Sequence, residues 1–205
     1  MKRTLAFAAS LLLLGACSSD GYTIRGKIAG LDNPYVYLLR YTGEVEVIDS
    51  AKVTKGDFVF KGKAEQPEVV YLSTDKQQPF VHFFLENGRI SVDGALSAPA
   101  DIAVLGTPSN DIQRAFDEQI AALEEEFAKA GNDMQRDSLR KEYSKLMSDA
   151  VEMNRDNIYG VTTFLNNAYA FLSPEEVMEQ IALFPAEWQP VSYTHLRAHE
   201  TDSYL

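Results

Sequence analysis

The stretch Gly106-Thr107-Pro108-Ser109-Asn110 separates two parts of the chain that have different patterns. Before it, apolar and polar residues tend to alternate, which is the period of two expected for strands. After it, apolar residues recur every three or four positions, as on one face of a helix. Pro108 is tolerated in the first turn of a helix, and Thr107 or Ser109 can cap it. The chain is therefore predicted to be α+β, with its strands first and its helices second.

The strand region is predicted to form an antiparallel β-sandwich or an open barrel, because its strands are short and evenly spaced. Asn87-Gly88 is the strongest short hairpin signal and predicts that residues 80–86 pair with residues 89–93. Lys55-Gly56-Asp57 predicts a second hairpin turn. The expected strands are residues 22–28, 35–41, 44–54, 58–60, 68–73, 80–86, 89–93 and 102–105.

The helical region is predicted to contain a helical hairpin and two shorter helices. Gly131-Asn132 breaks the first apolar pattern, so two long helices should fold back on each other. A third helix is expected over residues 161–172. Ser173-Pro174-Glu175-Glu176 is a capping box that begins a fourth helix, and Pro185 ends it. The change of period also predicts limited contact between the helical region and the strands.

Glu124-Glu125-Glu126 admits two interpretations, a metal or catalytic cluster and a solvated helix face. Consecutive residues on a helix point in different directions, which disfavours a shared site. We therefore expect an acidic, solvated face opposite the more basic second helix.

The N-terminus has the layout of a secretory signal. A positive end, Met1-Lys2-Arg3, precedes an apolar run that is too short to span a bilayer. Leu14-Gly15-Ala16-Cys17 resembles a bacterial lipobox, in which the cysteine thiol receives a diacylglycerol and becomes the new N-terminus. A plain signal peptide with a coincidental cysteine is the alternative. Ser18, rather than an acidic residue, follows Cys17, which favours the outer membrane over the inner one.

Composition limits the possible functions. The formal net charge of -11 leaves little to neutralise phosphates, so nucleic acid is not an expected partner. Cys17 is the only cysteine, so its lipidation leaves no thiol for a disulfide or a redox centre. No phosphate loop, nucleophile elbow or Cys-x-x-Cys is present, so we expect no catalytic residue, cofactor or metal, and no enzyme activity in these 205 residues. The aromatic residues have two interpretations. Most aromatic residues lie in protein cores, which is the default, whereas an exposed aromatic face of a strand would bind a peptide or a glycan.

The last residues differ from the rest of the chain. Val191 to Thr201 continue neither pattern and look like translated sequencing-adapter read-through. His195, His199 and Glu200 resemble a zinc pair on one helix face, but we interpret them as non-native. His82 is the remaining histidine and is expected to be a partly buried structural residue.

Several motifs together resemble the domain of unknown function 4369 (DUF4369). They are Tyr22-Thr23-Ile24-Arg25-Gly26-Lys27-Ile28-Ala29-Gly30-Leu31, Val36-Tyr37-Leu38, Asp49-Ser50, Gly56-Asp57-Phe58-Val59-Phe60-Lys61-Gly62 and Gly106-Thr107-Pro108-Ser109-Asn110-Asp111. The resemblance implies a β-rich module at the front of lipid-anchored thiol-disulfide interchange proteins of the TlpA/ResA type. The helices then resemble the spacer before a thioredoxin-like domain, which these 205 residues lack, so no catalytic residue is carried over.

Two functions follow as expectations. The first is a non-catalytic accessory module of a truncated thiol-disulfide oxidoreductase, anchored in the cell envelope and facing the periplasm. The second is a stand-alone envelope lipoprotein whose β-domain binds a peptide, a glycan or an envelope protein. The expected order is signal peptide, lipidated tether, β-rich domain, helical spacer and non-native tail, at residues 1–16, 17–21, 22–107, 108–188 and 189–205.

Overall fold

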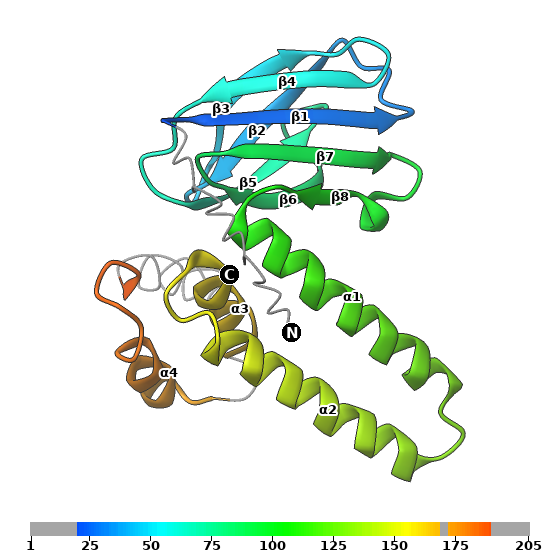
Figure 1. Cartoon of the computed structure of the whole chain (residues 1–205), viewed down its shortest axis with the longest axis vertical. Helices are drawn as coiled ribbons and strands as arrows, with labels where there is room; N and C mark the ends of the chain where they lie inside the picture. The colour runs from blue at the N-terminus through cyan, green and yellow to red at the C-terminus, as the bar shows by residue number, and fades with distance from the viewer. Residues whose placement is uncertain (1–19, 169–171, 190–205) are drawn as a thin grey trace, which may run out of the picture.

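The computed structural model describes residues 20–168 and 172–189, and within them strands precede helices as predicted (Figure 1). The fold is α+β. The strands are β1 (Tyr22–Ala29), β2 (Tyr35–Tyr41), β3 (Val45–Lys52), β4 (Asp57–Gly62), β5 (Glu68–Ser73), β6 (Pro79–Leu85), β7 (Arg89–Ala95) and β8 (Ala103–Leu105). The helices are α1 (Pro108–Lys129), α2 (Asp133–Glu152), α3 (Ile158–Ala168) and α4 (Pro174–Ile181), with a short 3₁₀ turn at Pro99–Asp101.

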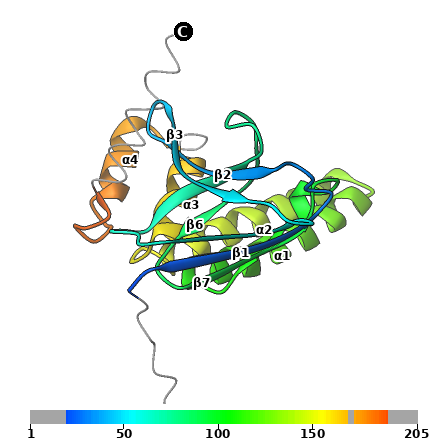
Figure 2. The ribbon, with the colours of Figure 1, turned by 90° about the horizontal axis from the view of Figure 1, so that it is seen from above.

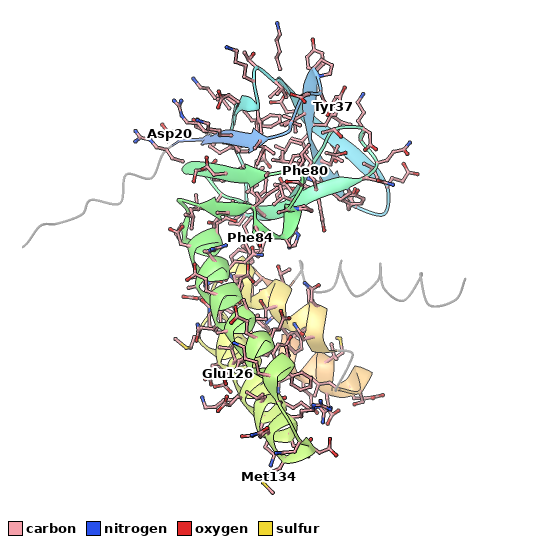
Figure 3. All side chains as sticks on the ribbon, turned by 90° about the vertical axis from the view of Figure 1, so that its right-hand side faces the viewer. Asp20, Tyr37, Phe80, Phe84, Glu126 and Met134 are labelled. Carbon is pink, nitrogen blue, oxygen red and sulfur yellow. The ribbon has the colours of Figure 1, made fainter. Side chains whose placement is uncertain are left out.

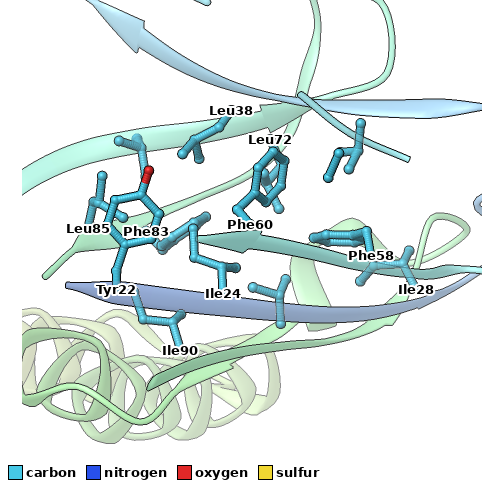
Figure 4. Close-up of a cluster of buried hydrophobic side chains, with 14 of the residues drawn as sticks. Tyr22, Ile24, Ile28, Leu38, Phe58, Phe60, Leu72, Phe83, Leu85 and Ile90 are labelled. Carbon is cyan, nitrogen blue, oxygen red and sulfur yellow. The ribbon is translucent and has the colours of Figure 1, made fainter. Parts of the chain in front are cut away.

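The strands form a sandwich of two four-stranded sheets, in the orders β4-β1-β7-β8 and β3-β2-β5-β6. Figure 2 shows β1 and β7 in one layer and β2 and β3 in the other. The pairing of β1 with β7 is parallel, whereas the other pairings of the named strands are antiparallel. Alternate residues of both sheets fill the space between them, including Ile24, Leu38, Phe60 and Leu72, each at most 1% exposed (Figure 4).

The predicted hairpin across Asn87-Gly88 is wrong, because β6 and β7 lie in different sheets. Asn87 is bonded elsewhere: its side chain accepts from Ala64 N at 2.9 Å and donates to Ala64 O at 2.8 Å. Gly88 bonds the start of β1, donating to Gly21 O and accepting from Thr23 N. These long-range bonds turn the chain from one sheet to the other.

The turn at Lys55-Gly56, in contrast, is closed by local hydrogen bonds. Both residues have positive φ, 55° and 83°, and Thr54 and Asp57 exchange two backbone hydrogen bonds across them. That is the geometry of a tight hairpin turn. The flanking strands nevertheless separate at once, because β3 pairs with β2 and β4 pairs with β1. The predicted turn is present, but it joins two sheets.

The expectation of limited contact between strands and helices is wrong at their junction. Asn110 is 1% exposed, and its side chain accepts from Phe84 N at 2.9 Å and donates to Phe84 O at 2.8 Å. The Glu86 carboxylate accepts hydrogen bonds from the backbone N and from the hydroxyl of Ser109. This carboxylate thereby provides an acceptor for a backbone N–H in the first turn of α1. Phe84 also packs with Tyr159 in a hydrophobic cluster that joins sheet to helices. In Figure 3, Phe84 lies where the two parts meet.

The helices follow the sequence prediction with shifted ends. Thr107 is the N-cap residue of α1, and the capping box at Ser173 and Glu176 is present. The third helix begins at Ile158 and the fourth ends at Ile181, both earlier than predicted. The three consecutive glutamates of α1 are exposed, as expected. Among the described residues, however, the ion pairs of the hairpin lie within each helix, such as Arg114–Glu118 and Lys145–Asp149, and none joins α1 to α2.

Candidate functional site: an aromatic sheet face

The two outer faces of the sandwich differ in chemistry. On the sheet that contains β1, the outward residues of that strand are Thr23, Arg25 and Lys27, and they are polar. On the other sheet, the outward residues of β2 include Tyr35 and Tyr37. Polar side chains suit a solvated face, whereas adjacent aromatic and apolar side chains on a surface mark an interaction site. The second face is therefore the candidate functional site.

The register places apolar and aromatic side chains in rows across this second face. Directly paired residues project on the same side of a sheet, so Val47, Leu39, Tyr71 and His82 form a row across four strands. Val45 pairs with Tyr41 in the neighbouring row. We call the set made of Tyr35, Tyr37, Tyr41, Val45, Val47, Tyr71 and His82 the aromatic face.

Contacts between rings hold the aromatic face in shape. The Tyr41 and Tyr71 rings meet edge to face with centroids 4.6 Å apart, and the His82 ring lies 6.0 Å from Tyr71. Burial raises the pKa of Tyr71 above its ordinary value, with a smaller contribution from Tyr41. The Tyr71 hydroxyl therefore stays protonated at neutral pH and can donate a hydrogen bond to a bound group.

The loop between β5 and β6 borders the aromatic face. The Lys76 ammonium lies 4.6 Å from the centroid of the Tyr37 ring, and the Tyr41 hydroxyl donates to Gln77 O at 3.4 Å. Asp75 holds the loop by accepting from Gln78 N and Gln77 N and from the Ser73 hydroxyl, and these bonds lower the pKa of the Asp75 carboxyl. A cation and ordered carbonyl groups thus stand beside exposed rings.

The helices border the opposite side. Val69 and Phe84 continue the outer face of the sheet but pack against α1 and α3, in a cluster with Phe116 and Tyr159. The Phe116 and Tyr159 rings are stacked at 5.5 Å, and burial raises the pKa of Tyr159 to about 12. The helices cover this end and leave Tyr41 and Val47 accessible, at 40% and 42% exposed.

The predicted site residues fall both inside and outside the described residues. His82 is exposed on the aromatic face, so its interpretation as a partly buried structural residue is wrong. Cys17, His195, His199 and Glu200 lie outside the described residues, as do the signal peptide and almost all of the proposed tail. Within residues 20–168 and 172–189, no three or more histidine, cysteine, aspartate or glutamate side chains gather as metal ligands would. No helix in those ranges has the length and hydropathy of a membrane span.

Comparison with known proteins identifies the strand region. Residues 22–113 match the family model described as Domain of unknown function (DUF4369). The match begins at the start of β1 and ends in the second turn of α1, so it includes the aromatic face and Asn110. No curated protein matches the chain.

Proposed function

Because residues 22–113 are a DUF4369 domain, we propose that the chain is the lipid-anchored accessory module of a thiol-disulfide interchange protein of the cell envelope. The module itself is non-catalytic. In this proposal, diacylglycerol on Cys17 attaches the module to a membrane, and the sandwich faces the periplasm. The outer membrane is favoured because Ser18, rather than an acidic residue, follows Cys17. The observation that supports the proposal most directly is the family match together with the lipobox that precedes it.

The helical region supports a spacer role. Met134 lies at the far end of the α1–α2 hairpin from the sandwich, as Figure 3 shows, so the hairpin extends the molecule away from the sheets. α1 is bonded to β6 through Asn110 and to the β6–β7 turn through Glu86, so the direction of the hairpin relative to the sandwich is set. A spacer fixed in this way would hold a following domain at a defined distance from the β-domain.

The proposal predicts what the native gene encodes. Reading the uninterrupted locus beyond the codon for Trp188 is expected to show a thioredoxin-like domain with Cys-x-x-Cys. Thiol-disulfide exchange needs an attacking thiolate and a second thiol to resolve the mixed disulfide. The intact product should therefore reduce insulin, whereas residues 1–205 alone should not. A native stop codon near Gln189, or insulin reduction by residues 1–205 alone, would contradict the proposal.

A second function, binding of a peptide, a glycan or an envelope protein, is favoured by the aromatic face. Tyrosine supplies a large contact area and a polar hydroxyl at low entropic cost, and it is enriched at interfaces. β3 is also an edge strand, to which an extended peptide could add. The two functions are compatible, since an accessory module acts by binding.

Substitution on the aromatic face tests this second function. Ligands are first selected from a peptide library and a glycan array by their binding to the unmodified full chain. We expect the double variant Tyr41→Ser/Val47→Ser to bind these ligands at least tenfold more weakly. The matched control is Val59→Ser, because Val59 is 45% exposed on the polar outer face of the other sheet. Tyr41→Ser also removes the edge-to-face contact with Tyr71, an arrangement worth about 0.5–1.5 kcal/mol, so circular dichroism is used to check that both variants fold. Equal loss in the control would show that the aromatic face is not the binding surface.

A further inference from the structure

A cavity of about 520 Å³ lies between α2, α3 and α4, apart from the aromatic face. Its apolar wall comes from Met147 and Val151 of α2, Phe164 of α3, and Leu172 just before α4. Glu152, at the end of α2, and Arg155, in the turn that follows, place one carboxylate and one guanidinium on its wall. Small-molecule sites have this size and this composition, a mostly apolar wall with a few fixed polar groups.

Arg155 is held in place but is incompletely bonded. Its guanidinium lies 5.5 Å from the centroid of the Phe184 ring, and Nη2 donates to Gln180 Oε1 at 3.3 Å. Nη1 is buried and has no hydrogen-bond acceptor among the described residues. A buried donor without an acceptor is unfavourable, and more so when the group is charged. The side chain is therefore oriented by neutral neighbours, and one charged nitrogen is left for another group.

Other half-buried arginines of the described residues show what Arg155 lacks. Arg40 pairs with the carboxylates of Glu68 and Glu46, and Arg114 pairs with Glu118. No ion pair among the described residues includes Arg155. A guanidinium matches a carboxylate in shape and charge, so a carboxylate is the missing partner that its chemistry selects.

We propose that this cavity binds a small monocarboxylate with an apolar body, whose carboxylate accepts from the Arg155 guanidinium and whose body contacts Met147, Val151, Phe164 and Leu172. Among the described lining residues Arg155 is the only cation and Glu152 the only carboxylate, so a second anionic group on the ligand would have no cationic partner and would be repelled by Glu152. The single unpaired guanidinium selects one carboxylate. An acyl chain and an aromatic acid share this chemistry, and the test separates them.

Titration of the purified full chain with decanoate and with 4-phenylbutyrate tests the proposal. Trp188 is the only tryptophan of the chain and packs against the cluster that contains Phe164, so its fluorescence should report binding. We expect a saturable change with at least one acid, and the tighter one identifies an acyl or an aromatic body. The neutral analogue of the tighter acid, decan-1-ol or 4-phenylbutan-1-ol, should bind at least tenfold more weakly. No saturable change with either acid, or equal affinity for acid and alcohol, overturns the proposal.

Variants locate the site. Arg155→Met should weaken binding of the tighter acid at least tenfold, whereas Arg114→Met, which removes a half-buried arginine outside the cavity, should leave it unchanged. Ser148→Phe should also weaken binding at least tenfold, because Ser148 lines the cavity and the new ring would occupy part of it. Ser148 is exposed, so this variant decides the question if Arg155→Met loses its helical circular dichroism. Unchanged affinity in a folded Arg155→Met, or in Ser148→Phe, overturns the assignment.

Discussion

Asn110→Ala is expected to lower the free energy of unfolding by about 3 kcal/mol, because it leaves two buried backbone groups without partners. The Asn110 amide bonds both the N–H and the C=O of Phe84, and its nitrogen also donates to Thr107 Oγ1 at 2.7 Å. Asn110 and Phe84 are 1% and 4% exposed, so water cannot replace the lost bonds without opening the junction. Each unsatisfied buried group costs roughly 1–3 kcal/mol.

Urea denaturation followed by circular dichroism measures this effect, and Asn132→Ala is the matched control. Asn132 is also an asparagine at the start of a helix, but it is exposed, and its side chain accepts one bond, from Gln135 N at 3.0 Å. Loss of such a cap costs about 1 kcal/mol. Equal destabilisation by the two variants would show that Asn110 acts only as a local helix residue and does not join the helices to the sheet.

Asn110 also illustrates how far local patterns predict this fold. The start of α1 was predictable, because Thr107 and Pro108 are helix-start residues next to a clear change of period. The bonds from Asn110 to Phe84 join residues 26 apart and have no signature in either segment. A local pattern can state that a helix begins, but the sheet against which it begins is decided by tertiary packing.

The same distinction explains the error at Asn87-Gly88. The strands begin and end within two residues of the predicted positions, because apolar and polar residues alternate along a strand whichever strand lies beside it. The identity of the neighbour depends on bonds such as those between Asn87 and Ala64, 23 residues apart. Turn chemistry favours a hairpin, yet β6 and β7 lie in opposite sheets, where Asn87 bonds Ala64 and Gly88 bonds the start of β1.

The aromatic face was only partly predictable. Tyr35 and Tyr37 stand at alternate positions of one strand, which shows that they share a side of the sheet but not whether that side is covered. Tyrosine suits either environment because it carries both a ring and a hydroxyl. No sequence pattern singles out Arg155. Its role depends on the folded structure, in which Nη1 is buried and has no hydrogen-bond acceptor among the described residues.

Cys17→Ser is expected to abolish lipid attachment completely, which is the largest effect on the location of the protein. A serine hydroxyl is a far weaker nucleophile than a thiolate at neutral pH, so the diacylglycerol cannot be transferred to it. The chain has no second cysteine to take its place. Without the lipid, the signal would remain uncleaved, and the precursor would keep residues 1–16.

Metabolic labelling with a radioactive fatty acid measures attachment, and electrophoresis detects the longer precursor. The matched control is Ser18→Ala, which changes the neighbouring hydroxyl residue and should leave both labelling and processing intact. Several acyl chains together hold a protein on a membrane almost irreversibly, whereas one myristoyl chain gives an association constant of only ~10⁴ M⁻¹. The labelled wild type should therefore remain with the membrane fraction after washing. Normal cleavage of Cys17→Ser, with no label in the wild type, would show a plain signal peptide instead, and the β-domain would then act free of any lipid anchor at Cys17.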